Sequence, residues 1–290
     1  MRTLKAALAL LIITLSFLSG QAQTRFDNLE FKQFSTPEGL PNSMVHQVYQ
    51  DRDGYIWIST FYGLFRYDGY EVRTYKSNLY TPGLLVNNNV ICVKEDYSHR
   101  LWIGTHEGLC VLDKQTGKMR KMKLEGISKH RLNEIHVTKD NKVYLGYIRG
   151  MACYNAELDT LELMTSKNCK GEVPEQINIQ TLLEDENGDL LIGTWQDGLF
   201  HYNIKENKFT HYPPLDESNS VLALFQDSKG ALWVGTSGSG LYKVNFSPDK
   251  KTLSVEKAYK HDALNTLSLS SDYIYSIHED LQTHSLWLGT

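Results

Sequence analysis

The chain has 290 residues, with 30 Lys and Arg against 34 Asp and Glu and a formal net charge of −4. It contains no basic tract, so nothing in the charge pattern favours binding to a phosphate backbone, and we expect no nucleic-acid partner. Apart from the first residues, no apolar run approaches the ~20 residues that span a bilayer.

The first 22 residues have the layout of a secretory signal peptide. Arg2 and Lys5 give a basic start, residues 6–18 are apolar, and Gly20 and Ala22 supply small residues for cleavage after Ala22. An apolar core of about 13 residues is too short to span a membrane, so we favour a cleaved signal over an anchor. This segment predicts export to the periplasm, where disulfides are chemically allowed.

A lone strand is expected next, at about 31–35. Residues 31–34 resemble segments that end later repeats, such as 72–75 and 209–212. We interpret it as a closing strand of velcro type, through which a ring of repeats pairs with its own last member.

One pattern then recurs to the end of the chain, about every 40–50 residues. An apolar pair precedes an acid, and a strand and a Gly-Leu or Gly-Met turn follow. The acids are Asp51, Asp96, Asp185, Asp227 and Asp280, with Thr138 in the third copy. The strands lie at 57–60, 102–105, 144–147, 191–194, 233–236 and 287–290. Turns rich in Asp, Asn and Gly separate short strands, which predicts an all-β fold.

The period and the strand order predict a β-propeller of four-stranded antiparallel blades. We expect blades at about 44–80, 89–125, 131–165, 178–213 and 220–260, and the start of a sixth at 273–290. The propeller is then incomplete, with five blades plus the start of a sixth, and the chain is part of a longer protein. The apolar pairs, such as Val45 and Val48, are expected on opposite faces of the inner strand, because strand side chains alternate.

The sequence shows no catalytic signature, and we predict no catalytic residue, no metal and no cofactor. Turns 51–54 and 185–189 resemble the first half of an EF-hand loop, but the closing glutamate is missing, and hairpin chemistry explains their composition. Cys92 and Cys110 are expected to be small core residues. Whether Cys153 and Cys169 pair is left open, because geometry decides it.

The candidate ligand site lies in the loops between the second and third strands of each repeat. These loops differ while the strands around them repeat, and loops on a rigid scaffold carry function. Aromatic rings that stack on sugar faces stand there beside charged groups that bind hydroxyls. The predicted ligand-binding residues are Phe61, Tyr62, His106, Glu107, Arg149, Trp195 and Asp197.

Other readings of these loops stay open. They can contact a protein partner, or vary without function. A secreted propeller enzyme, a lyase or a glycosidase, would need an acid and a base on one face, and Glu107 and Asp197 are the only plausible pair.

The repeat itself resembles the two-component regulator propeller repeat. The resemblance rests on residues 45–51, 54–60 and 63–68, and again on 221–227, 230–236 and 240–245, and it extends over about 30–290. Residues 34–41 are also similar to the start of hybrid two-component sensors. In the third copy Tyr147 and Thr138 depart from the pattern, so that blade is expected to be irregular.

The resemblance implies the N-terminal periplasmic sensor region of a hybrid two-component system histidine kinase. Such proteins carry two propellers, an immunoglobulin-like domain, a membrane helix and a cytoplasmic kinase, and their members typically sense oligosaccharides from complex glycans. An oligosaccharide ligand and a homodimeric, inner-membrane parent protein are therefore expected, with the membrane contacted only by parts outside this chain. No binding residue is carried over, because the repeat motif does not fix one.

Overall fold

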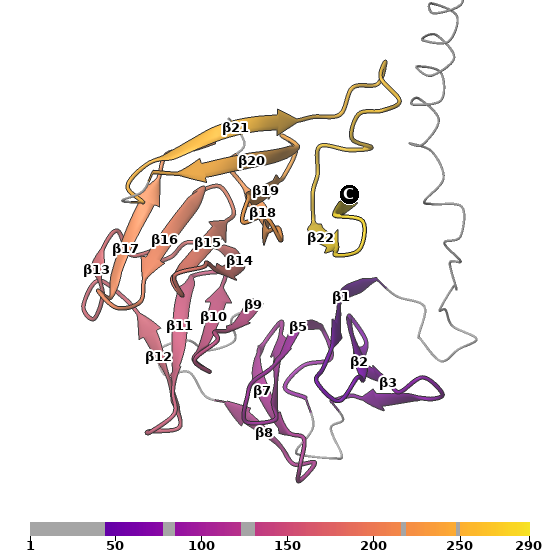
Figure 1. The fold of residues 1–290 in the computed structure, drawn as a ribbon. Coiled ribbons are helices and arrows are strands. Elements are labelled where there is room, and N and C mark those ends of the chain that lie inside the picture. The colour runs from indigo at the N-terminus through magenta and orange to yellow at the C-terminus, as the bar shows by residue number, and fades with distance from the viewer. Residues whose placement is uncertain (1–43, 78–84, 123–130, 216–218, 248–249) are drawn as a thin grey trace, which may run out of the picture.

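The computed structural model describes residues 44–77, 85–122, 131–215, 219–247 and 250–290. The described elements are all β-strands, and they form separate small sheets around a common centre (Figure 1). Within these ranges, no helix is long and apolar enough to cross a membrane. The predicted signal peptide and the closing strand at 31–35 lie outside the described residues.

The strands follow the repeats in chain order. The first sheet holds β1 (Val45–Gln50), β2 (Ile56–Thr60), β3 (Gly63–Tyr67) and β4 (Val72–Tyr75). The second holds β5 (Val90–Glu95), β6 (Arg100–Thr105), β7 (Gly108–Asp113) and β8 (Met119–Met122). The third holds β9 (Leu132–Val137), β10 (Val143–Tyr147), β11 (Gly150–Asn155) and β12 (Thr160–Met164).

The fourth sheet gains one strand. It holds β14 (Ile179–Glu184), β15 (Leu190–Thr194), β16 (Leu199–Asn203) and β17 (Lys208–Tyr212), and the short β13 (Lys170–Gly171) pairs parallel with β17. The fifth holds β18 (Val221–Gln226), β19 (Leu232–Thr236), β20 (Leu241–Phe246) and β21 (Leu253–Tyr259). The described part of the sixth holds β22 (Ser276–Asp280) and β23 (Ser285–Gly289).

Apart from β13, consecutive strands of each sheet pair antiparallel in chain order. The first strands, β1, β5, β9, β14, β18 and β22, pack next to one another in this sequence. Figure 1 shows them nearest the centre, with the later strands of each sheet outside them. The prediction of a propeller with four-stranded antiparallel blades, five of them followed by the start of a sixth, is confirmed.

The prediction that the apolar pairs point to opposite faces is wrong. The register shifts by one residue near the start of each of the first five inner strands, for example between Val90 and Cys92. This β-bulge cancels one step of the alternation. Val90 and Val93 consequently pack in one cluster with Trp57 of the preceding sheet, while Cys92 packs toward the following one.

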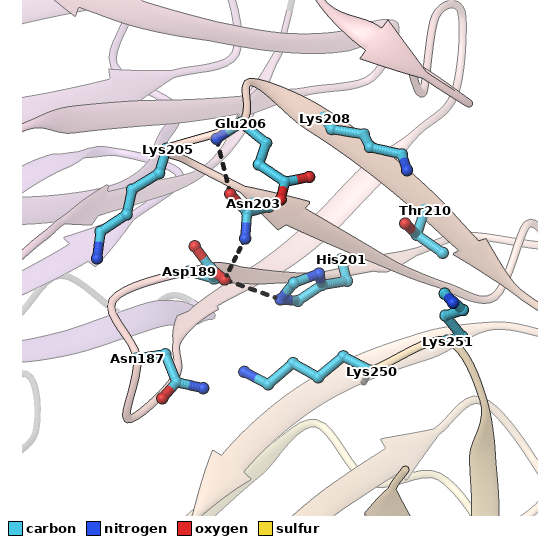
Figure 2. Close-up of a pocket in the computed structure, with 10 residues that line it drawn as sticks. All are labelled: Asn187, Asp189, His201, Asn203, Lys205, Glu206, Lys208, Thr210, Lys250 and Lys251. Carbon is cyan, nitrogen blue, oxygen red and sulfur yellow. Dashed lines mark hydrogen bonds and ion pairs between the residues drawn. The ribbon is translucent and has the colours of Figure 1, made fainter. Parts of the chain in front are cut away.

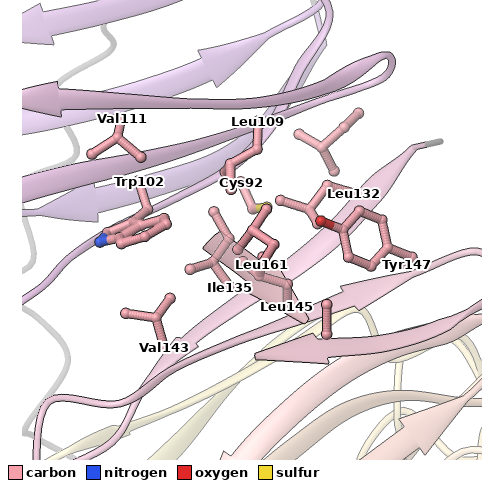
Figure 3. Close-up of a cluster of buried hydrophobic side chains, with 12 residues drawn as sticks. Cys92, Trp102, Leu109, Val111, Leu132, Ile135, Val143, Leu145, Tyr147 and Leu161 are labelled. Atoms are coloured by element: carbon pink, nitrogen blue, oxygen red, sulfur yellow. The ribbon is translucent and has the colours of Figure 1, made fainter. Parts of the chain in front are cut away.

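Each hydrophobic core lies between two neighbouring sheets. In the cluster of Figure 3, Trp102 of the second sheet packs against Ile135 and Val143 of the third, and all three are at most 1% exposed. Removing such a buried aromatic side chain typically costs about 3–5 kcal/mol. The sheets therefore hold one another, and each repeat depends on its neighbours.

The recurring acid and tryptophan form one hydrogen-bonded unit. The indole N–H groups of Trp57, Trp102 and Trp233 each donate to Oδ2 of the preceding acid (Asp51, Asp96 and Asp227) at 2.8 Å. The other oxygen of each acid accepts two backbone N–H groups of its own turn. The acid thus satisfies a buried indole and closes the hairpin, which explains why the two residues recur together.

The strand glycine and threonine have separate packing roles. A Cβ at Gly193 would lie 2.6 Å from side-chain carbons of both Thr181 and Val221, so only glycine allows the next sheet to approach. Thr194 Oγ1 donates to the carbonyl oxygen of Gly198 at 2.8 Å and fixes the loop between β15 and β16. The motif is therefore explained by packing and loop closure.

Two further sequence expectations meet the structure here. Cys92 and Cys110 are buried core residues, as predicted, and all four cysteines are free thiols. Trp287 has the position in its repeat that Trp57 and Trp102 have in theirs, but its side chain is 42% exposed. The reason is that its strand, β23, pairs only with β22 among the described residues.

Candidate functional site

The seven predicted ligand-binding residues all lie in loops at one end of the sheets, which we call the loop face. These are the loops between β2 and β3, β6 and β7, β10 and β11, and β15 and β16. The first residue of several such loops donates its backbone N–H to the residue just before the inner strand of the same sheet. The pairs are His106 with Asn89, Ile148 with Arg131, Trp195 with Asn178 and Ser237 with Ser220. Each repeat therefore brings two chain segments together on this face.

The predicted aromatic residues are exposed on the loop face. Phe61 is 37% exposed, Tyr62 58% and Trp195 40%, whereas Trp57 and Trp102 in the strands are at most 1% exposed. His106, Glu107 and Arg149 are also exposed, and Asp197 is half-buried. The side chains are available to a ligand, which is the arrangement that the sequence predicts.

The loop that carries Trp195 is held rigidly. The backbone N–H of Gln196 donates to Ser220 Oγ at 3.0 Å, and Asn219 Nδ2 donates to the Gln196 carbonyl oxygen at 3.0 Å. Gln196 has a φ of +73°, a left-handed conformation that costs energy outside glycine and needs such support. Trp195 is consequently presented on a pre-formed loop, which lowers the entropy cost of binding.

Other loop-face residues escaped the sequence analysis. The ring of His46 lies 4.3 Å from the ring of Phe61, and its Nε2 is 3.1 Å from Asn89 Oδ1. Burial lowers the pKa of His46 below that of a free histidine. Tyr273 and Tyr275, just before β22, are 49% and 63% exposed. For Tyr273 and Tyr275, their place just before an inner strand was the available signal.

The seven residues form an array along the loops and do not make a catalytic cluster. In the described part of the chain, no hydrogen bond or ion pair joins any two of them. Glu107 and Asp197 belong to the second and fourth sheets, with the third sheet between them. The seven side chains are therefore spread over the loops of four sheets.

A polar cavity lies at the end of the fourth sheet that is opposite to the loop face, and Figure 2 shows the residues that line it. Its volume is about 540 Å³, and turns of the fourth and fifth sheets line it. At its base, Nε2 of the buried His201 lies 3.7 Å from an oxygen of Asp185 and 3.5 Å from one of Asp189. The ammonium group of Lys250 contacts Asp185 directly.

Asp185, Asp189 and His201 are close enough together to be considered as metal ligands, because their ligand atoms lie within 4.8 Å of one another. Lys250 already supplies the positive charge at Asp185, and Asn203 Nδ2 donates to Asp189 at 3.0 Å. Lysines 205, 208 and 251 add further positive charge around the cavity. A metal ion would have to displace an ammonium group against this field, so the chemistry does not favour one.

Comparison with the other repeats gives this cluster a structural role, because the fourth repeat lacks the tryptophan that hydrogen-bonds to the acid elsewhere. Leu191 occupies the position that Trp57 and Trp102 have in other repeats, so Asp185 has no indole donor. Lys250 donates to Asp185 in its place, and His201, which lies opposite Leu191 on β16, stands nearby with Nε2 3.7 Å from the carboxylate. Burial alone would raise the pKa of Asp185, but hydrogen bonds from His201 and Lys250 lower it well below its usual value. The cluster therefore fastens the fifth sheet to the fourth.

Three stretches of the chain match a known family model. A family model described as two component regulator propeller matches residues 39–62, 84–107 and 216–238. Histidine kinase P4 of Formosa agariphila is 34% identical over 67 residues, which are 23% of this chain and 5% of that protein.

Solved structures resemble the fold as a whole. The extracellular domain of a putative hybrid two component system from B. thetaiotaomicron has a TM-score of 0.66 at 20% identity, over 89% of this chain and 40% of that one. The extracellular domain of a putative one component system from the same organism has a TM-score of 0.58 at 25% identity, over 86% of this chain and 37% of that one. Virginiamycin B lyase from Staphylococcus aureus has a TM-score of 0.64 at 10% identity, over 86% of this chain and 78% of that one. The chain thus spans well under half of the extracellular domains that it resembles.

Proposed function

The chain carries two-component regulator propeller repeats, and on that basis we propose that it is the extracytoplasmic sensing region of a two-component regulator and binds an oligosaccharide. The observation that carries the proposal is the array of exposed aromatic and charged side chains on rigid loops at one end of the sheets. The resemblance to extracellular domains of putative one component and hybrid two component systems supports a location outside the cytoplasm. A cleaved signal peptide at 1–22 is part of this proposal.

The ligand class follows from the side chains on the loop face. Phe61, Tyr62 and Trp195 offer ring faces that can stack on the apolar faces of sugar rings. His106, Glu107, Arg149 and Asp197 offer donors and acceptors for hydroxyl groups. A flat and polar oligosaccharide uses both kinds of contact, whereas a purely apolar ligand would leave the charged groups without partners.

Signalling requires that the ligand discriminate between two states. In the proposed mechanism, the oligosaccharide binds one arrangement of a dimeric periplasmic region more tightly than the other and so changes the activity of a histidine kinase in the same protein. Only such a difference in affinity can shift the equilibrium.

A matched pair of aromatic substitutions tests the site. Purified protein is screened by thermal shift against a panel of oligosaccharides, since a ligand that binds the native state raises the melting temperature. Trp195→Ala should weaken binding of the hit about ten- to a hundredfold, as for a truncated aromatic anchor. Tyr70→Ala is the control, because Tyr70 is 98% exposed in the turn at the other end of the first sheet.

The outcomes separate the alternatives. If Trp195→Ala binds the hit as tightly as the unaltered protein, the loop face is not the site. A panel without any stabilising glycan would favour a protein-interaction propeller. Cleavage of a glycan that is lost in a Glu107→Gln/Asp197→Asn variant would favour a secreted lyase or glycosidase.

A further inference from the structure

A small cavity between the first and second sheets, away from the loop face, has unusual electrostatics. We call it the arginine cleft; its volume is about 250 Å³, and Tyr55, Arg66, Arg73, Tyr75 and Lys114 line it together with Asp53. These residues come from the outer strands and turns of the first sheet and from the β7–β8 turn of the second. The cleft is therefore at the opposite end from Trp195 and its neighbours.

Two arginines face each other across a strand pair in this cleft. Arg66 on β3 is the direct cross-strand partner of Arg73 on β4. Like charges directly opposite each other in an antiparallel pair are destabilising. In the second sheet the equivalent pair is Val111 with Arg120, and Asp159 neutralises Arg120 with two hydrogen bonds of 2.8 and 2.7 Å.

The arginine pair has no such neutralising partner. Neither guanidinium group forms an ion pair or donates a hydrogen bond to any other described residue, and Nε of Arg66 is buried without a partner. The nearby Asp53 pairs with Lys114 at 2.7 Å, and Oδ1 of Asp68 accepts the backbone N–H groups of residues 70 and 71. A buried guanidinium nitrogen without an acceptor is costly, so an acceptor from outside the chain is expected to stabilise the site.

Aromatic rings hold the two guanidinium groups in place. The guanidinium carbon of Arg66 lies 4.2 Å from the ring centre of Tyr55, and that of Arg73 lies 5.4 Å from the ring centre of Tyr75. Stacking on a ring uses the face of a guanidinium group and leaves its N–H edge available. The free edges match the planar geometry of an oxyanion, which arginine binds in a bidentate manner.

From this arrangement we infer that the arginine cleft binds the carboxylate group of a uronate sugar. The two arginines supply the charge, and the tyrosine rings supply apolar walls that a free inorganic ion would not use. The volume is below that of pockets for drug-sized ligands, so it admits a single sugar residue. The site goes beyond the proposed function, since it adds a second binding place and commits it to acidic saccharides.

Calorimetric titration of the full chain at constant ionic strength tests the inference, with three probes. Glucuronate is the acidic sugar, glucose is its neutral match, and inorganic sulfate is the free anion. We expect measurable binding of glucuronate and none of glucose. Arg66→Gln and Arg73→Gln should each weaken glucuronate binding at least tenfold. Lys121→Gln, which removes an exposed charge from the neighbouring sheet, should leave it unchanged.

Several results would overturn the inference. Equal binding of glucose and glucuronate, or full affinity in Arg66→Gln, would show that the arginines do not form the site. Sulfate binding as tight as glucuronate binding would rule out the sugar assignment. The melting temperatures of the two variants distinguish a loss of binding from unfolding. They should not fall, because each substitution removes a like-charge contact. Trp195→Ala should keep full glucuronate affinity, so failure here is distinct from failure of the loop-face proposal.

Discussion

Replacing Lys114 with methionine should weaken the contact between the first and second sheets and so destabilise the fold. The side chain of Lys114 is 9% exposed, and its Nζ lies 2.8 Å from Asp51, 2.7 Å from Asp53 and 2.8 Å from Glu95. Burial alone would lower the pKa of Lys114, but hydrogen bonds to these three carboxylates raise it, so the ammonium is charged at any physiological pH. Methionine keeps the length and the apolar stem of the side chain and removes only the charge.

The size of the effect follows from what remains around each carboxylate. Removing one partner of a buried ion pair typically costs about 3–5 kcal/mol. Asp51 keeps three N–H donors, and Glu95 keeps the backbone N–H of Arg52 at 2.8 Å. Asp53 is half exposed and adds little, because water screens it. We therefore expect Lys114→Met to lose about 3 kcal/mol of unfolding free energy, at the lower end of that range.

Urea unfolding at pH 7 measures this loss. The control is Lys243→Met, since Lys243 pairs with Glu256 at 2.7 Å on the surface, and such pairs contribute about 0.2–1 kcal/mol. Hydrogen bonding and charge from Lys114 lower the pKa of Asp53. That contribution is present above the ordinary pKa of the carboxyl group and is lost as the pH falls, so the small part of the loss that comes from Asp53 should disappear in acid. A loss in Lys114→Met no larger than in Lys243→Met would refute the reasoning.

Two further predictions concern one residue of an inner strand, Glu134, and one of a second strand, Gly193. Burial raises the pKa of Glu134 to about 7, above its value in the unfolded chain, so its ionisation costs stability as the pH rises from about 4.5 through 7. The effect of Glu134→Gln on the free energy of unfolding should accordingly be about 1–2 kcal/mol more stabilising at pH 8 than at pH 5. Urea unfolding midpoints at both pH values measure it, and an equal effect at both would contradict the prediction. Gly193→Ala should lower the free energy of unfolding by about 1–3 kcal/mol, because the new Cβ would lie 2.6 Å from Val221 of the next sheet. A melting temperature equal to that of the unaltered protein would instead show that the sheets can move apart.

The repeat was predictable from the sequence because its key contacts are local. Asp51 and Trp57 lie six positions apart in one hairpin, and their hydrogen bond needs only that hairpin to form. The same holds for Asp96 and Trp102. Spacing alone therefore fixed the strand order and the position of the turns.

The parts that escaped prediction depend on contacts between strands or sheets. The bulge that places Val90 and Val93 on one face is a property of strand register, which side-chain alternation does not reveal. His201 comes close to Asp185 only because β16 lies beside β15, and Lys250 reaches Asp185 from a different sheet. The unpaired state of Arg66 is likewise visible only when every neighbour in space is known.

The two ends of the sheets have different roles in the molecule. At the end with the acidic turns, carboxylates tie each sheet to another: Glu95 accepts a backbone N–H from the first sheet at 2.8 Å, Glu184 one from the third at 3.0 Å, and Glu279 one from the fifth at 2.6 Å. Because these contacts and the intersheet cores hold the sheets in position, the loop face does not have to contribute to stability. The loops of this face are then free to differ in sequence, as those with Tyr62 and Trp195 do. A scaffold of similar repeats can therefore present a non-repeating surface to a ligand.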